Sequence, residues 1–388
     1  MNGTLNLPAG TVAIGDFTLT HRGLVTNMTG GANLTSTVNG LFDVTNNHTM
    51  TVTAPAATID ANVRYRTNGG NTFLFANAST GDLTIQKNFT MTRANTSGTV
   101  SFDIGAGRTL TLAGINVTIN ANTQFIATNG GTTGVLLFDI AGVHAPTTMQ
   151  TVSLPAGFSV VNLTISDDVT LTGTIATSTL TVTTSFIHTA GQLVFGSANL
   201  QIGNGTVATF QRTGPSTYSG EGYLIWNSTN PNGFNQSTVP AAGAMTINNF
   251  RVNANLTSQV DRNLVIAKNL HLNNGSITIQ SVAPNNHSGT FRIGISGGVV
   301  PKVTVNDNQD VLNSGLVYDN ANVDFEFTGS VNYTANHTRI WPGTAGLVRD
   351  VRLDKTGGTL FLAGTNRTIN RDLILRNGTL NITSNNLN

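Results

Sequence analysis

Short stretches of alternating apolar and polar residues recur along the whole chain. Examples are TLTL at 109–112, NVTI at 116–119, NLTI at 162–165 and NLQI at 199–202. Alternation of this kind places every second side chain on the same face of a β-strand. Turns rich in Gly and Asn separate the stretches, because these residues tolerate the left-handed backbone that tight turns need. The pattern predicts many short strands, each with one buried face.

The composition limits what such a chain can do. Only 10% of its 388 residues are charged, against about a quarter in an ordinary domain, and 39% are hydrophobic. The net charge of +1 gives no electrostatic reason to expect nucleic acid or an anionic membrane as a partner. No apolar run approaches the roughly 18 residues of a membrane span. The chain has no cysteine, which excludes disulfides and thiolate metal sites.

A longer repeat underlies the alternation. NLTI at 162–165, NFRV at 249–252 and DVRL at 350–353 align, and the similarity continues into NLHLNNGSITI at 269–279 and DLILRNGTLNI at 372–382. These offsets predict a super-repeat of roughly 90–100 residues. The predicted organisation is 1–158, loosely repetitive coils; 159–246, a first super-repeat with an aromatic insert at 216–234; 247–347, a second with an insert at 301–343; and 348–388, a truncated third.

Strands this short, with one apolar face and frequent turns, favour a right-handed parallel β-helix, or β-solenoid, in which each coil stacks on the previous one. If a coil takes roughly 20–24 residues, the chain makes about 16–19 coils at a strand spacing of about 4.8 Å. Tandem β-sandwich domains are the alternative, and they predict Pro-containing linkers between super-repeats. Pro215, Pro231 and Pro240 do lie between the first two aligned segments.

The same motif stands near both ends of the chain, as NGTLNL at 2–7 and NGTLNI at 377–382. A solenoid exposes its apolar core at an end that no capping turn covers. We therefore expect a segment of a longer protein, or a subunit whose ends are covered by neighbours. The expected partners are further coils of the same or neighbouring chains, through end-to-end self-assembly.

The cadence of these repeats resembles the β-strand repeats of large secreted surface proteins of the Bacteroidota, which are similar to adhesin-type parallel β-helices. The matching stretches are residues 161–175, 248–279, 323–343 and 349–382. The resemblance implies export, a cell-surface or extracellular location, and a role in adhesion, matrix or surface structure, with no catalytic residue and no cofactor. We expect a non-enzymatic structural or adhesive protein, a segment of a stalk or filament. A glycan-binding or polysaccharide-degrading β-helix is the alternative.

Asparagine sequons are frequent. The chain has twenty N-x-S/T sequons, about twice the number that its Asn, Ser and Thr content gives by chance. They predict N-glycosylation of an extracellular surface, although a repeat that contains NGT and NLT produces sequons by itself. Candidate glycosylation sites are Asn27, Asn33, Asn47, Asn88, Asn116, Asn162, Asn255, Asn332, Asn366 and Asn377.

Aromatic residues are sparse but gather in the insert at 216–234. Tyr218, Tyr223 and Trp226 lie within it, and a loop that interrupts a solenoid is a common place for binding. Sugars stack on exposed aromatic faces, so these three residues are a candidate glycan-contact site. The competing interpretation is an inserted strand pair that packs its own aromatic residues, and the second insert at 301–343, which repeats the arrangement, favours it.

Acidic residues form three local groups, Asp167 with Asp168, Asp307 with Asp310, and Asp319 with its neighbours up to residue 326. Asp307 and Asp310 begin an oxygen-rich stretch of the kind that binds calcium, without the ligand spacing and terminal Glu of an EF-hand. They are a candidate calcium site. The seven histidines show no metal-ligand spacing, and neither a Ser-His-Asp arrangement nor a phosphate-binding glycine loop is present, so no cofactor and no catalytic residue is predicted.

Overall fold

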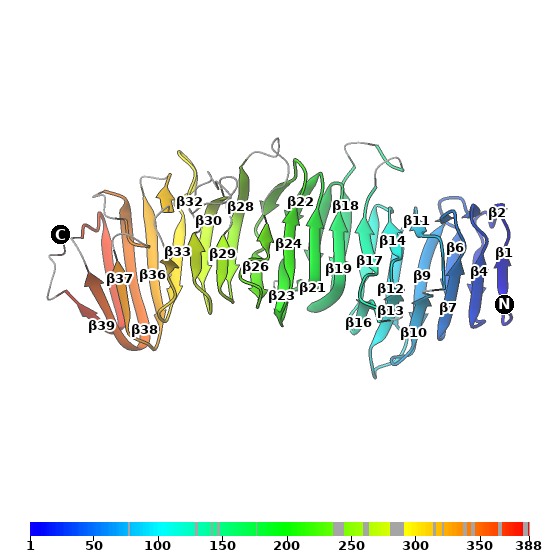
Figure 1. Ribbon diagram of the computed structural model, residues 1–388, viewed down its shortest axis with the longest axis horizontal. Coiled ribbons are helices and arrows are strands. Elements are labelled where there is room, and N and C mark those ends of the chain that lie inside the picture. The colour runs from blue at the N-terminus through cyan, green and yellow to red at the C-terminus, as the bar shows by residue number, and fades with distance from the viewer. Residues whose placement is uncertain are drawn as a thin grey trace. The chain divides into compact units, whose positions relative to one another are not determined.

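The chain is an all-β protein whose strands stack in parallel as a β-solenoid of about 14 turns (Figure 1). The predicted fold class is confirmed, and the tandem sandwiches are wrong because sandwich sheets are antiparallel. None of the described residues forms a helix long and apolar enough to cross a membrane. The computed structural model describes residues 1–388 except 77, 129–130, 141–142, 146–147, 176, 236–243, 259–263, 280–290, 313–315, 320–321, 337–339, 343–345, 364–366, 383–386 and 388.

The chain divides into two compact units, Met1–Leu200 and Gln201–Asn388. In the N-terminal unit each early coil contributes one strand to each of three parallel sheets, called A, B and C here. Sheet A contains β1 (Leu5–Leu7), β4 (Val25–Met28), β7 (His48–Val52), β10 (Thr72–Phe75), β13 (Val100–Ile104) and β16 (Thr123–Ile126). Sheet B contains β2 (Gly10–Ala13), β5 (Ala32–Thr35), β8 (Ala57–Asp60), β11 (Leu83–Ile85), β14 (Thr109–Leu112), β17 (Val135–Phe138), β19 (Gly157–Ile165) and β21 (Thr179–His188). Sheet C contains β3 (Thr18–His21), β6 (Leu41–Val44), β9 (Asn62–Thr67), β12 (Phe89–Arg93), β15 (Asn116–Ile119), β18 (Gln150–Leu154), β20 (Val169–Gly173) and β22 (Gln192–Phe195).

The C-terminal unit also consists of parallel strands, in one long sheet and one small one. The division between the units falls within β23 (Asn199–Thr206), and β25 is Thr217–Gly220. The long sheet contains β24 (Thr209–Arg212), β26 (Leu224–Ser228), β27 (Phe234–Asn235), β28 (Met245–Val252), β30 (Leu264–Leu272), β32 (Phe291–Ile293), β33 (Lys302–Asn306), β35 (Leu316–Tyr318), β36 (Val323–Gly329), β37 (Tyr333–Asn336), β38 (Val348–Ala363) and β39 (Asp372–Asn381). The small sheet contains β29 (Leu256–Ser258), β31 (Ile277–Ile279) and β34 (Val311–Leu312).

The register between coils aligns the inward side chains of successive strands, so that they form buried columns. In sheet A, Phe73 pairs with His48 below it and with Phe102 above it, and Phe102 pairs with Phe125. The rings of Phe73 and Phe102 stack at 4.4 Å between centroids. All four side chains are at most 3% exposed. Because each inward side chain meets its equivalent in the next coil, the core is a set of columns held by dispersion and apolar burial.

Coil length differs from the prediction. Equivalent positions in sheet C are as close as 19 residues, for Gln150 and Val169, and as far apart as 35, for Asn116 and Thr151. Long turns leave fewer coils than the predicted 16–19, because loops lengthen a coil without adding a strand. Turns stay tight where the backbone of one coil crosses the next. A Cβ atom on Gly30, for instance, would stand 2.2 Å from the carbonyl oxygen of Ala54.

The super-repeat coincides with bulged long strands. Residues 162–165, 249–252 and 350–353 lie in β19, β28 and β38, and each adjoins a register shift. In β19 the first half packs against β16 and the second half pairs with β17. A β-bulge bends a strand, so here it replaces the turn that joins two faces of a coil. The repeated sequence therefore marks a repeated corner.

Candidate functional site

Asparagine and aspartate side chains join successive coils at their turns. The Oδ1 atom of Asn47 accepts the backbone N–H of Thr72 at 2.9 Å, and that of Asn332 accepts the N–H of Thr359 at 2.7 Å. A strand entering a turn leaves an amide without a ladder partner, and a short side-chain carbonyl one coil away satisfies it. The same bond is made by Asp82 to Thr109, Asn88 to Asn116, Asp103 to Thr128, Asp168 to Gln192, and Asn255 to Ser276.

This bond accounts for four of the candidate sequons, and the side chain of a fifth residue, Asn116, bonds the preceding coil. Asn47, Asn88, Asn255 and Asn332 each stand immediately before a strand, and Asn116 is the first residue of one. In all five the next side chain is buried and the following Thr points outward. Three consecutive positions are involved: an Asn that bonds a neighbouring coil, an inward apolar or aromatic residue, and an outward Thr. Their sequence is N-x-T. The geometry of the turn thus produces the sequon, whether or not a glycan is attached.

The candidate glycosylation sites fall into three environments. Asn162 is only 9% exposed, and its Nδ2 donates to the carbonyls of Thr132 at 2.6 Å and Gly134 at 2.9 Å. A glycan on this nitrogen would replace one of its two hydrogens and break at least one of these bonds, so Asn162 does not suit glycosylation in the folded chain. Asn33 is half-buried, and Asn366 lies outside the described residues. The exposed sites are Asn27, Asn47, Asn88, Asn116, Asn255, Asn332 and Asn377.

The aromatic stretch 216–234 forms strands of the stack rather than an exposed loop. It contains β25, β26 and part of β27. Trp226 is fully buried, packs edge-on against Phe234 at 5.6 Å and donates from Nε1 to the carbonyl of Asn255 at 3.3 Å. Tyr218 is 6% exposed, and burial raises the pKa of its phenol. Neither ring offers a face on which a sugar could stack.

Tyr223 is the half-buried member of the candidate glycan-contact site. The guanidinium of Arg251 lies over its ring, 4.7 Å from the centroid. A cation held over an aromatic face occupies the position that a sugar ring would take. The structure therefore gives the three predicted rings packing roles.

The candidate calcium residues hold turns. Asp307 has a left-handed backbone, with φ of 52°, and its Oδ1 accepts the N–H groups of Ser330 at 2.6 Å and Val331 at 3.1 Å. The Oδ1 of Asp310 accepts the Val311 N–H at 2.8 Å and the Tyr333 hydroxyl at 3.2 Å. Each of these donors directs a hydrogen toward the place that a cation would take. No three His, Asp or Glu side chains come together for a metal ion in the described part of the chain.

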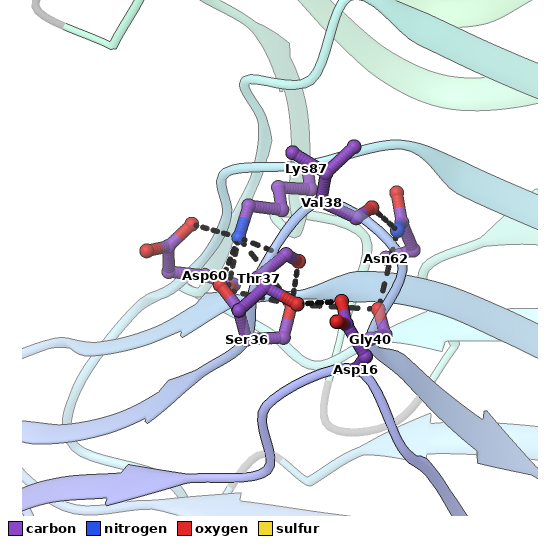
Figure 2. Close-up of polar contacts among 8 residues, drawn as sticks. All are labelled: Asp16, Ser36, Thr37, Val38, Gly40, Asp60, Asn62 and Lys87. Carbon is purple, nitrogen blue, oxygen red and sulfur yellow. Dashed lines mark hydrogen bonds and ion pairs between the residues drawn. The ribbon is translucent and has the colours of Figure 1, made fainter.

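A lysine ammonium joins coils at one corner of the N-terminal unit (Figure 2). The Nζ of Lys87 donates to the carbonyls of Ser36, Thr37 and Asp60, the last at 3.1 Å, and lies 3.2 Å from the Asp60 carboxylate. It thereby joins three successive coils. Lys355 does the same in the C-terminal unit, where its 1%-exposed side chain donates to the carbonyl of Thr328 at 2.8 Å.

The third acidic group belongs to a network of ion pairs on the C-terminal unit. Glu326 lies between Lys302 at 2.5 Å and Arg352 at 3.2 Å. Arg349 pairs with Asp324 at 2.8 Å, and Asp319 pairs with Arg292. Each of these carboxylates faces a cation on a neighbouring strand of the stack. The pairs therefore cross-link successive coils.

Arg371 extends this network at β39. Its guanidinium bonds the Asp350 carboxylate at 2.7 Å and lowers the pKa of that group. Asp354 is bonded at 2.8 Å by both Arg352 and Asn377, and these contacts lower its pKa too. Exposed pairs of this kind stabilise little one by one.

An open groove of about 650 Å³ lies on the outer face of sheet A. Thr49, Leu74 and Asp103 form one outward column across β7, β10 and β13 and line it. Leu24, which is 63% exposed, stands at one end. The Asp103 carboxylate, 4% exposed, accepts both the N–H and the hydroxyl of Thr128, at 3.0 and 2.5 Å. The groove combines apolar contacts with polar groups, as small-molecule sites do.

Sequence patterns did not reveal this groove, since its lining residues come from separate coils and meet only when the register is known. Comparisons with protein families, with curated proteins and with solved structures gave no match. The function must therefore be inferred from the geometry of the two units.

Proposed function

We propose that the chain is a segment of an extracellular stalk or filament, a structural or adhesive protein without a catalytic step. The observation that carries the proposal is the connection between coils, in which ladders of core side chains run in register and Asn, Asp and Lys side chains bond one coil to the next at the turns. Such a stack resists local bending because each turn is fixed on both sides. The resemblance to surface β-strand repeats supports the same role.

A cell-surface location is tested directly on intact cells of the source organism. Antibodies raised against the purified chain are expected to label intact cells, and external protease is expected to remove the label. Labelling that requires permeabilised cells would contradict the proposal. An antibody against a cytosolic protein, which must not label intact cells, serves as the control.

Glycosylation is a separate part of this proposal. The chain purified from its native source is expected to carry glycans at exposed sequons such as Asn47 and Asn332, whose Nδ2 atoms are not needed for the bond to the next coil, and none at Asn162. Glycopeptide mass spectrometry reads each site. A glycan on Asn162 would contradict the structural account, and a chain without any glycan would remove this part of the proposal.

End-to-end association is the partner that we propose. Strand β39 leaves Leu373 37%, Ile374 41% and Leu375 57% exposed, and its described pairing is with β38. Apolar side chains beside an unpaired strand edge recruit another strand. Light scattering after gel filtration is expected to show concentration-dependent oligomers that Leu375→Lys abolishes. Val207→Lys, at an apolar residue 66% exposed elsewhere, is the matched control. A monomer at every concentration refutes this partner.

Glycan binding is a second candidate function, and the sheet A groove is the observation that favours it. A sugar places CH groups and hydroxyls side by side, and the groove offers Leu24 and Leu74 beside Thr49 and Thr72. On a glycan array, wild-type binding is expected to be lost in Thr49→Trp, which fills the groove. Thr58→Trp, on the outward face of sheet B, should retain it. An array without any bound glycan rejects this candidate.

A further inference from the structure

One outer face of the N-terminal unit carries a regular grid of short uncharged polar side chains. It lies on sheet C, over β12, β15, β18 and β20. Strand pairing aligns the first file, since Thr118 pairs with Thr90 on one side and Ser153 on the other, and Ser153 pairs with Thr172. A second file lies two residues before the first in each coil. The polar grid consists of Asn88, Thr90, Asn116, Thr118, Thr151, Ser153, Thr170 and Thr172.

The grid is stiff. Five of its members are threonines, whose β-branched side chains are restricted at χ1. Neighbours in a file also bond to one another: the Ser153 and Thr172 hydroxyls are 3.1 Å apart, and the Asn116 amide donates to Asn88 Oδ1 at 3.2 Å. All eight side chains are half-buried or exposed. Positions of the polar atoms are therefore set by the backbone rather than by flexible side chains.

The spacing of the grid follows from the sheet. Neighbouring residues within one file are ~4.8 Å apart, which is the spacing between coils. The two files are ~6.7 Å apart, which is the length of two residues along a strand. In ice, each water is hydrogen-bonded tetrahedrally to about four others at an O···O distance of about 2.75 Å. This geometry separates second-neighbour oxygens by about 4.5 Å and gives a repeat of about 7.3 Å along the stacking direction. Both grid spacings agree with these to within about a tenth. Waters bonded to the grid thus stand close to positions of an ice lattice.

Two polar files side by side distinguish this face from sheet B. Sheet B has one file of similar residues, Thr58, Thr84 and Thr111. A carboxylate flanks each face, since Asp60 stands two residues after Thr58 and Asp168 stands two residues before Thr170. The long sheet of the C-terminal unit carries the ion-pair network around Glu326. A charged side chain orients water around itself and disrupts a lattice, whereas the grid contains none.

We propose that the polar grid on sheet C binds ice. Ordered waters on the two files join the lattice of a growing crystal, and the stiff, uncharged face holds them there. Arg64 and Arg66 on β9 bound the grid on one side. On the other side Val194 of β22 pairs with Thr170, so an apolar residue ends that file. The Thr170 hydroxyl itself donates to the sulfur of Met149, the residue before β18. Ice binding by this face does not require the stalk role.

The test uses the full chain. Purified protein is expected to show thermal hysteresis, to inhibit ice recrystallisation and to enter a slowly growing ice front, while bovine serum albumin is excluded. Thr118→Tyr and Ser153→Tyr, which place a ring in the middle of the grid, should each lose most of all three effects. Thr111→Tyr on sheet B is the matched control and should keep them.

Wild-type protein that is excluded from ice, or equal loss in the sheet B control, would overturn the proposal. If a grid variant unfolds at a lower temperature than the wild type, the ice-binding measurements on the wild-type chain still test the proposal. Binding to crystalline cellulose or chitin without any effect on ice also counts against it, since the grid would then recognise a polysaccharide surface. Surface labelling of cells is a separate readout, so failure here leaves the stalk proposal standing.

Discussion

His48 continues the aromatic ladder of sheet A into the first coils, and we predict that it makes these coils sensitive to acid. Its side chain is 2% exposed and lies 5.0 Å from the rings of both Phe73 and His21. Its Nδ1 is 3.1 Å from the Gly23 carbonyl and its Nε2 is 2.9 Å from the Thr26 hydroxyl. Replacement by Phe keeps a ring in the column and removes the titrating group.

The magnitude follows from the pKa of the imidazole. Burial lowers the pKa of His48 from 6.5 to about 4, with a smaller contribution from His21. As the pH falls below 6.5, the unfolded imidazole takes up a proton before the folded one does. The stabilising contribution is therefore complete above pH 6.5 and is lost as the pH falls toward 4. A gap of about 2.5 pH units at ~1.4 kcal/mol per unit corresponds to about 3 kcal/mol.

The assay must read these coils locally, because a solenoid opens in parts. Hydrogen exchange followed by mass spectrometry, corrected for the intrinsic pH dependence, gives the opening free energy of peptides that cover β4 and β7. In the wild type this free energy is expected to fall by about 3 kcal/mol between pH 6.5 and 4. In His48→Phe most of that fall should disappear, and the remainder belongs to His21, whose pKa burial also lowers.

His271→Phe provides the control. Burial lowers the pKa of His271 to about 4 as well, but it lies on β30 of the C-terminal unit, so its replacement should leave the pH dependence of β4 and β7 unchanged. An equal fall in wild type and His48→Phe would refute the reasoning, and so would a wild type whose β7 amides show no loss of protection in acid.

Three further substitutions test the connections between coils by the same local exchange measurement. Asn162→Ala leaves two carbonyls without their donor and should cost about 1–3 kcal/mol around β19, whereas Asn377→Ala at an exposed site should cost little. Lys87→Met removes the ammonium that joins three coils, and protection around residues 36–37 should fall by about 1–3 kcal/mol at pH 7. Phe102→Ala opens the centre of a ring ladder and should cost about 3–5 kcal/mol at β10 and β13; unchanged protection in any of them would contradict the contacts described.

The fold could be predicted from the sequence because its signal is local. Alternation in TLTL at 109–112 fixes which side chains are inward without any knowledge of neighbouring coils, and these residues form β14 with Leu110 and Leu112 fully buried. The super-repeat also had a structural cause, namely the bulged corners of β19, β28 and β38. Coil number was overestimated, since a turn of any length joins two strands equally well.

Sites were harder to predict because they depend on the register between coils. Tyr218 and Trp226 looked like an exposed cluster in the chain, but the inward position of Trp226 is apparent only once β26 and β28 are paired. Asp103 carried no local sign of a groove, since Leu74 and Thr49 reach its column from the two preceding coils. The register between strands of successive coils depends on the lengths of the loops that join them. The alternation of apolar and polar residues does not predict these loop lengths.

The sequons show how one pattern can carry two meanings. At Asn47 and Asn332 the side-chain oxygen bonds the next coil while the nitrogen stays exposed, so this bond and a glycan can coexist. At Asn162 the nitrogen itself makes the structural bonds. A stack that needs an Asn before an inward residue and an outward Thr acquires glycosylation signals as a by-product. An excess of sequons in such a chain is therefore first a sign of coiled β-structure, and evidence for export only where the nitrogen is exposed.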